Sequence, residues 1–308
     1  MSNLLRRSRA ALAVTVATGA LIAVGSPAGA AAAPTNSASA SFLMDGTTGA
    51  TLAYKGGDTK RQMASTTKIT TAVVVLTTPG LDLNKKVTIK QEYRDYVVRE
   101  GASTANLKAG ATPTVRQLLY AMMLPSGCDA AYALADTFGS GATTAARTKD
   151  FIAKMNAKAK SLGMTNTTYD SFDGISPTVA GNVTTARDLA KMTRFAMRSS
   201  TFKSIVKTTA ISSGGTATVA TWTNTNELLQ ANSGHFAPGA IGVKTGTGSI
   251  AGRCIVFSAT RNGKTVIGVL LNDDSRYPDA NKLIDWAVGP AAGAATLRSI
   301  PPRPDVLD

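Results

Sequence analysis

The sequence predicts an α/β protein of the α+β type: one antiparallel sheet flanked by helices, with an all-helical lobe inserted into it. Strand-like apolar runs lie near both ends of the chain, helix-compatible periodicity fills the middle, and turns rich in glycine and asparagine separate the strands. Strands at both ends with helices between them favour one sheet assembled from the two termini. We therefore expect a sheet lobe formed by residues 31–80 and 224–290, and a mainly helical lobe over residues 81–223.

Residues 1–30 have the composition of a secretory signal. Three arginines precede an apolar run over residues 10–24, and small residues suited to signal cleavage follow it. Cleavage after Ala30 or after Ala33 fits equally well. Two adjacent arginines raise a twin-arginine route, but their flanks match that signal poorly, so ordinary secretion is favoured.

The charge of the chain favours an anionic partner. Without the three arginines of the signal, the formal charge falls from +14 to +11, which predicts attraction to polyanions. Basic residues are not interleaved with aromatics, so we expect no nucleic-acid partner, and an exported protein meets anionic cell-wall polymers first.

No second apolar segment reaches membrane length, and residues 291–308 lack an amphipathic pattern. We expect an extracytoplasmic, wall-associated monomer without a transmembrane anchor.

Two cysteines and one histidine restrict the chemistry further. They are too few for a disulfide scaffold or a metal cluster, so we expect no metal and no other cofactor. A bridge between Cys128 and Cys254 stays open, because sequence alone cannot show whether the two residues approach one another.

The expected elements follow in chain order. Two strands over residues 41–45 and 50–55 flank a Gly-Thr-Thr-Gly turn, and a closing helix covers residues 279–288. Helix signals occupy residues 65–76, 114–123, 129–138, 143–162, 184–199 and 200–207. Strand signals return over residues 241–245, 253–260 and 264–272, with an Arg-Asn-Gly turn between the last two.

The start of the helix at Ser65 carries the first chemical signal. Ser65 and Lys68 stand three residues apart before an apolar run that ends at Leu76, so on a helix they share a face. A serine hydroxyl is a weak nucleophile until a base takes its proton, and a lysine can be that base only when burial or a nearby cation favours the neutral amine. The alternative is an N-cap serine beside a solvated lysine, since such short motifs recur by chance.

Two later stretches strengthen the functional interpretation. Ser126 and Cys128 lie in a loop between two expected helices, and an expected strand ends in Lys244, Thr245, Gly246 and Thr247. With Ser65 and Lys68, these stretches resemble the penicillin-recognising serine D,D-peptidases, whose ordered signatures are Ser-x-x-Lys, Ser-x-Asn and Lys-Thr-Gly. The resemblance covers essentially the whole mature chain and implies the fold shared by penicillin-binding transpeptidases and β-lactamases.

The resemblance implies a role for each of these residues. Ser65 would attack the penultimate D-alanine carbonyl of a peptidoglycan stem peptide, and β-lactams would acylate the same hydroxyl. Lys68 would be the base, and Ser126 would relay a proton to the leaving amine. The backbone N–H groups of Ser65 and Thr247 would form the oxyanion hole.

The end of the last motif would bind the substrate. Lys244, Thr245 and Thr247 would receive its terminal carboxylate, and Lys244 would add a positive charge beside Lys68. Gly246 would let the strand approach the substrate without a Cβ in the way.

Cys128 departs from the family pattern, which has asparagine at this position. A thiol is a weaker donor and acceptor than an amide, so the substitution predicts altered acceptor preference, with hydrolysis poorer relative to transpeptidation, and a thiol-sensitive site. Secreted family members that resemble this variant favour transpeptidation. The alternative is that Cys128 is an inert apolar filler.

Three rival functions remain at this stage. A class A β-lactamase needs a deacylating glutamate in a loop between the second and third motifs. The region where we would expect that loop, residues 163–177, has no Glu-x-x-Leu-Asn pattern, and the three glutamates of the chain, Glu92, Glu100 and Glu227, all lie outside it. A Ser-His-Asp hydrolase would have to use His235, and the chain has no Gly-x-Ser-x-Gly elbow. An inactive wall-binding protein would have no need of the complete set of motifs.

Overall fold

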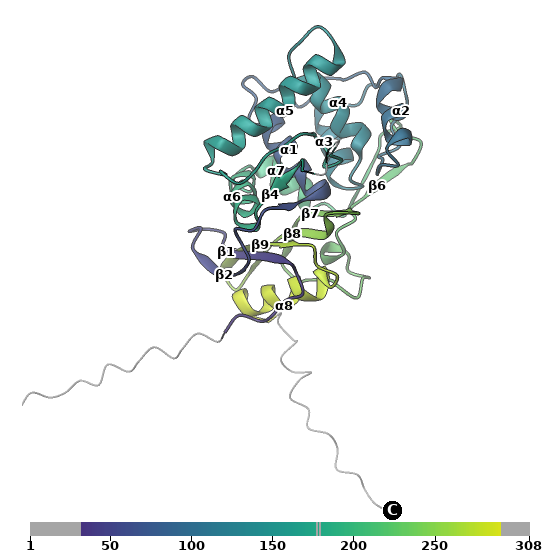
Figure 1. The fold of residues 1–308 in the computed structure, drawn as a ribbon. Coiled ribbons are helices and arrows are strands. Elements are labelled where there is room, and N and C mark those ends of the chain that lie inside the picture. The colour runs from purple at the N-terminus through teal and green to yellow at the C-terminus, as the bar shows by residue number, and fades with distance from the viewer. Residues whose placement is uncertain (1–31, 177, 179, 291–308) are drawn as a thin grey trace, which may run out of the picture. The chain divides into compact units, whose positions relative to one another are not determined.

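A five-stranded antiparallel sheet built from both ends of the chain is the centre of the fold, which confirms the predicted class (Figure 1). The computed structural model describes residues 32–176, 178 and 180–290. The predicted signal over residues 1–30 and the tail over residues 291–308 lie outside the described residues. The strands are ordered β2-β1-β9-β8-β7. Their bounds are Thr51–Lys55, Ala40–Asp45, Lys264–Leu271, Gly252–Arg261 and Ala240–Gly248.

The central strands of the sheet are buried on both faces. Successive side chains of a strand point to opposite faces, so neighbouring residues enter different cores. On β1, Phe42 belongs to the larger core beneath the helices, whereas its neighbour Leu43 belongs to a second core against α8 (Arg276–Val288). Val256 and Ile255 of β8 divide between the two cores in the same way. The central strands are therefore almost continuously apolar.

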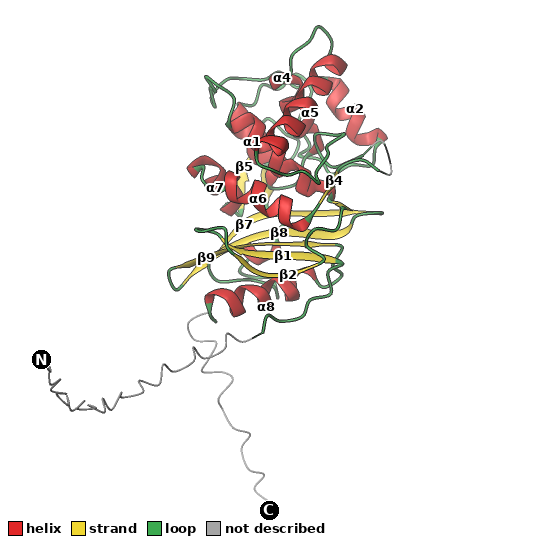
Figure 2. Ribbon diagram, turned by 60° about the vertical axis from the view of Figure 1, so that its left-hand side comes forward, coloured by secondary structure: helices red, strands yellow, loops and turns green. Residues whose placement is uncertain are grey.

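Helices form a layer on each face of the sheet (Figure 2). Helix α8 packs on one face against β8 and β9, while α6 (Ala186–Ala196) and α7 (Ser200–Lys207) pack on the other. Helix α1 (Lys68–Leu76) is buried from Lys68 to Val75, as expected of a central helix. Around it lie α3, α4 and α5, which span Val115–Met123, Cys128–Phe138 and Thr144–Ser161. No helix among the described residues is long and apolar enough to cross a membrane.

Several elements differ from the sequence-based expectation. Helix α2 (Gln91–Arg99) was not expected, since it is strongly charged and buries only Tyr93 and Val97. The short pairs β3/β4 and β5/β6 were also missed, because ladders of two or three residues give no readable alternation; they span Arg61–Gln62, Val183–Thr184, Ala210–Ser212 and Thr221–Thr223. Helix α8 begins three residues earlier than expected, and β7 continues three residues further.

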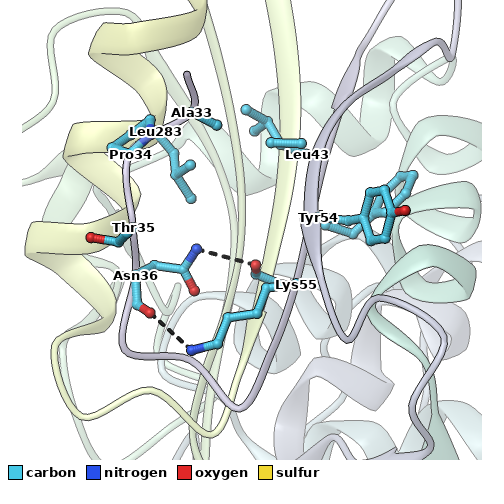
Figure 3. Close-up of a pocket in the computed structure, with 11 residues that line it drawn as sticks. Ala33, Pro34, Thr35, Asn36, Leu43, Tyr54, Lys55 and Leu283 are labelled. Atoms are coloured by element: carbon cyan, nitrogen blue, oxygen red, sulfur yellow. Dashed lines mark hydrogen bonds between the residues drawn. The ribbon is translucent and has the colours of Figure 1, made fainter. Parts of the chain in front are cut away.

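The segment before β1 is fixed to the edge of the sheet. Asn36 donates from Nδ2 to Ser41 Oγ at 3.2 Å, and Lys55 of β2 donates to the Asn36 carbonyl at 3.0 Å (Figure 3). A cavity of about 320 Å³ lies between this segment, the two strands and Leu283 of α8. None of the predicted site residues lines this cavity.

Candidate active site

The serine at the start of α1 stands on a 3₁₀ turn rather than in the α-helix itself. The turn η1 covers Ala64–Thr67, and α1 begins at Lys68. In 3₁₀ geometry side chains three residues apart lie almost directly above one another. The Lys68 Nζ accordingly lies 2.9 Å from Ser65 Oγ, which is the direct contact that the spacing predicted.

Lys68 is fully buried and uses all three of its donors. Besides Ser65 Oγ, its Nζ donates to the Asp173 carbonyl at 2.9 Å and to Cys128 Sγ at 3.3 Å. A neutral amine has two N–H groups and one lone pair. With the carbonyl and the sulfur taking the two N–H groups, the remaining position of a neutral Lys68 faces the Ser65 hydroxyl.

The loop from residue 170 holds Asp173 in that place. Gly174 has a φ of +100°, and a Cβ there would lie 2.1 Å from the Ala64 carbonyl oxygen, so no larger residue fits. The Asp173 carboxylate is buried and accepts from the Tyr96 hydroxyl at 2.8 Å and the Ile175 N–H at 3.0 Å. The main-chain carbonyl is thus presented to Lys68 by a fixed loop.

Ser126 lies in the loop before α4, with a left-handed φ of +65°. Non-glycine residues rarely adopt this conformation, which favours a functional constraint. The loop is held by Ser103, whose hydroxyl donates to the Ser126 carbonyl at 2.7 Å. Asp129 in the first turn of α4 fixes the facing segment by accepting from the N–H groups of Ala105 and Leu107.

Cys128 is the first residue of α4 and is completely buried. Burial raises the pKa of its thiol to about 11, although the adjacent Lys68 acts in the opposite direction. The thiol is therefore neutral at physiological pH. Cys254 is also buried, and both cysteines are free, so the bridge that the sequence left open is not formed.

Lys244 on β7 is buried beside the same cluster. Its Nζ donates to the Thr245 carbonyl at 2.9 Å. Burial lowers the pKa of Lys244 well below its ordinary value, and the positive charge of Lys68 adds to this effect. Lys244 is thus the expected second lysine near Lys68, and burial strongly disfavours its charged form.

The end of β7 closes on the serine turn at Gly246. A Cβ at Gly246 would lie 3.0 Å from Ser65 N and 3.1 Å from the Met63 carbonyl oxygen, which is tighter than side chains tolerate without a shift. Arg276 at the start of α8 donates from one Nη1 to the Gly246 carbonyl and to Thr247 Oγ1, both at 3.0 Å. This strand end is therefore positioned by a guanidinium that the sequence reasoning did not single out.

A cleft of about 550 Å³ opens above these groups. Ser65, Cys128 and Thr247 line it, while Lys68 and Lys244 lie buried behind them. Thr245 is mostly buried and shares a hydroxyl contact of 3.1 Å with Thr225. The structure therefore brings Ser65, Lys68, Cys128 and Thr247 together at the cleft. Ser126 precedes Cys128 by two residues, and no hydrogen bond among the described residues joins its hydroxyl to Ser65 or Lys68. His235 lies on another cavity, beside Glu227.

Sequence reasoning missed the groups that act through the backbone or from other elements. Asp173 contributes a carbonyl rather than its side chain, and Ser103 stands in a loop without a motif. Arg276 could have been suspected only as a cation near a predicted helix start, which is a weak signal.

The fold and this constellation define a serine D,D-peptidase. The family model described as D-alanyl-D-alanine carboxypeptidase, of peptidase family S11, matches residues 28–275. The chain belongs to this family.

Named relatives extend over almost the whole chain. The D-alanyl-D-alanine carboxypeptidase of Streptomyces sp. (strain K15) is 50% identical over 293 residues, covering 91% of this chain and 98% of the relative. DacB2 of Mycobacterium tuberculosis is 33% identical over 282 residues, covering 88% and 90%. The crystal structure of the Streptomyces K15 DD-transpeptidase superposes with a TM-score of 0.78 at 51% identity, covering 83% of this chain and 98% of that one.

Proposed function

We propose that this enzyme forms an acyl-enzyme at Ser65 with peptidoglycan stem peptides ending in D-alanyl-D-alanine. The observation that carries the proposal is the 2.9 Å contact between Lys68 Nζ and Ser65 Oγ, with the other two donors of Lys68 occupied. In its neutral form, Lys68 takes the hydroxyl proton as Ser65 attacks the penultimate carbonyl. The N–H groups of Ser65 and Thr247 receive the negative charge that develops on the oxygen. As the bond to the terminal D-alanine breaks, Ser126 relays the proton held by Lys68 to the departing nitrogen.

The terminal carboxylate of the donor peptide binds at the end of β7. Thr247 is exposed at this strand end, and Thr245, Gly246 and Lys244 lie buried beside it. A bound carboxylate supplies the counter-charge that Lys244 lacks in the free enzyme, since this lysine has no acidic partner among the described residues. β-Lactams carry a comparable carboxylate and acylate the same serine.

We propose that the acyl group is transferred to an amine more readily than to water. Cys128 offers the acyl-enzyme only a weak, neutral thiol, where an asparagine amide would supply two donors and an acceptor. An incoming amine brings its own hydrogen-bonding groups and depends less on this support than a water molecule does.

The same proposal covers the setting of the enzyme. A secretory signal, the positive charge and a substrate in the cell wall support export and wall association of a monomer. The sheet and the mainly helical segment would act as two lobes with the cleft between them, divided near residues 80 and 223.

Labelling with a fluorescent penicillin tests the nucleophile. The wild-type enzyme should retain the label through denaturing electrophoresis, and Ser65→Ala should not. Ser233→Ala, which removes a serine that does not line the cleft, serves as the matched control and should label fully. Label on the Ser65→Ala variant would contradict the assignment.

A donor peptide tests the fate of the acyl group. Diacyl-Lys-D-Ala-D-Ala should yield more transfer product than free acid when glycine is present as acceptor, as measured by mass spectrometry. A β-lactamase would instead turn over nitrocefin rapidly and leave this donor intact. Predominant hydrolysis at saturating acceptor would contradict the preference for transfer but leave the acyl-enzyme standing.

A further inference from the structure

A cavity remote from the active-site cleft has the chemistry of an oxyanion site. It measures about 360 Å³ and lies between α6, α7 and the face of the sheet that these helices cover. Its lining includes Arg194, Arg198, Lys203 and Ser258. None of the described residues that line it is acidic. Ile241 marks the cavity on β7 and Thr247 marks the cleft, six residues or about 20 Å further along the strand.

Two of the cations at this cavity have no side-chain partner in the part of the chain that the structure describes. The side chains of Arg198 and Lys203 are exposed, and neither makes a hydrogen bond or an ion pair with another described residue. Arg194 is half-buried and donates from Nε to the Gly46 carbonyl at 3.3 Å and from Nη2 to the Thr47 carbonyl at 2.6 Å. These bonds fix the guanidinium and leave its Nη1 group without a hydrogen-bond partner among the described residues.

The electrostatic balance at the cavity is positive. Asp45 contributes a carboxylate whose pKa Arg194 helps to lower, but its strongest bonds are to the N–H groups of Thr47 and Thr48. It does not line the cavity. The carboxylate of Asp45 is therefore already hydrogen-bonded within its own turn and does not neutralise the three cations at the cavity.

Ser258 supplies an independent observation. This residue of β8 is fully buried, and its Oγ has no hydrogen-bond partner. An unpaired buried hydroxyl costs about 1–3 kcal/mol, so a native fold normally satisfies it. Ser258 lines the cavity and shares the helix-covered face of β8 with Val256, so an oxygen of a bound group could satisfy its hydroxyl there.

We propose that this cavity binds a phosphate ester. Three cations and a hydroxyl can share more oxygens than a carboxylate provides, and guanidinium groups suit phosphate geometry. The volume exceeds that of a single phosphate group, which leaves room for the polyol attached to it. The source favoured by the net positive charge is a phosphodiester-linked anionic polymer of the cell wall. Such an anchor would hold the enzyme on its substrate layer while the cleft stays free.

Calorimetric titration of the full chain tests the proposal, with inorganic phosphate, glycerol phosphate and a short glycerol phosphate oligomer as probes. The Arg198→Ala/Lys203→Ala variant should bind the oligomer about tenfold more weakly or worse, because it loses charge-assisted hydrogen bonds. Arg116→Ala/Lys207→Ala is the matched control. It removes two equally exposed and unpartnered cations from α3 and α7 that do not line the cavity, and it should retain wild-type affinity.

Ser258→Ala tests whether the buried Ser258 hydroxyl contacts the bound phosphate. It should leave thermal stability unchanged or slightly higher, because the hydroxyl has no partner in the free protein, and still weaken phosphate binding severalfold. Penicillin labelling of Ser65 should persist in every variant, which shows that the fold and the cleft are intact. Tighter binding of the oligomer than of glycerol phosphate assigns the polymer as the source, and equal binding assigns a small ester.

Two results would overturn the site. One is the absence of saturable binding for all three probes. The other is an equal loss in the control pair, which would make the effect one of overall charge. Neither result bears on the acyl-enzyme at Ser65, which the labelling experiment tests separately.

Discussion

Cys128 is the residue at which this enzyme departs most from its family's motif. Its sulfur replaces an amide at 3.3 Å from Lys68 Nζ, so the lysine keeps a contact there but the acyl-enzyme loses a donor. We expect Cys128→Asn to raise hydrolysis of the donor peptide about tenfold, the worth of one neutral hydrogen bond. Release of D-alanine without an added acceptor measures this. An unchanged rate would show that the sulfur is only a filler.

The same thiol should resist alkylation. Because burial raises the pKa of Cys128 to about 11, the reactive thiolate is scarce at pH 8 compared with a free cysteine of pKa about 8.5. Iodoacetamide should modify the folded enzyme slowly at pH 8 and faster as the pH approaches 11. Mass spectrometry of peptides that carry residue 128 follows the reaction. Rapid labelling at pH 7 would contradict this picture and restore the thiol sensitivity expected from the sequence.

Burial of Lys244 lowers the stability of the folded protein, and we attribute its retention to binding of the substrate carboxylate. Its folded pKa is lowered, so the folded state takes up its proton less readily than the unfolded chain, and the charge destabilises the fold at neutral pH. Stability from this group is regained as the pH rises towards the unfolded value of about 10.4. Lys244→Met should therefore raise the free energy of unfolding by about 1–2 kcal/mol at pH 7, with the gain vanishing near pH 10. Urea unfolding at both pH values measures it, and donor turnover should be lost.

At the scale of elements, the contact between β7 and the serine turn leaves little room for a side chain at Gly246. Gly246→Ala forces the strand away from Ser65, and a displacement of about 1 Å can cost a hundredfold in rate. Gly248→Ala is the matched control, because its Cβ would meet Ala251 and Ala64 at an ordinary 3.7 Å. Stopped-flow acylation by a chromogenic β-lactam should separate the two variants. Equal rates would mean that the strand adapts.

The long elements could be predicted from the sequence because their pattern is local. The apolar runs after Lys68 and on both sides of Asn262 are visible without a structure. Helix α2 could not, since most of its side chains stay in solvent. The three motifs pointed to the side chains of the proposed site, but not to the Asp173 carbonyl or Arg276, because neither of these contacts depends on a local residue pattern. Their roles arise when distant segments meet.

At the scale of the whole molecule, α8 should be indispensable. It covers a separate apolar core that includes Leu43, Phe257 and Leu283, and Asp279 accepts from the Ser37 N–H and hydroxyl before β1. A chain of residues 34–290 should fold and bind penicillin, whereas one of residues 34–275 should be insoluble or unlabelled. Circular dichroism and labelling of both chains check this. Labelling of the shorter chain would show that the second core is dispensable.

The pairing of β1 with β9 also sets when the enzyme can become active. Phe42 lies opposite Val269, so β1, the first strand to be synthesised, cannot pair with β9 until almost the whole sheet has been synthesised. Ser65 and Lys68 emerge early, yet the wall of the cleft formed by β7 and the Arg276 contact arrive only with the final quarter of the chain. A nascent or partly exported chain therefore has its nucleophile without a binding site. Chain topology therefore links completion of the acylation site to the end of synthesis.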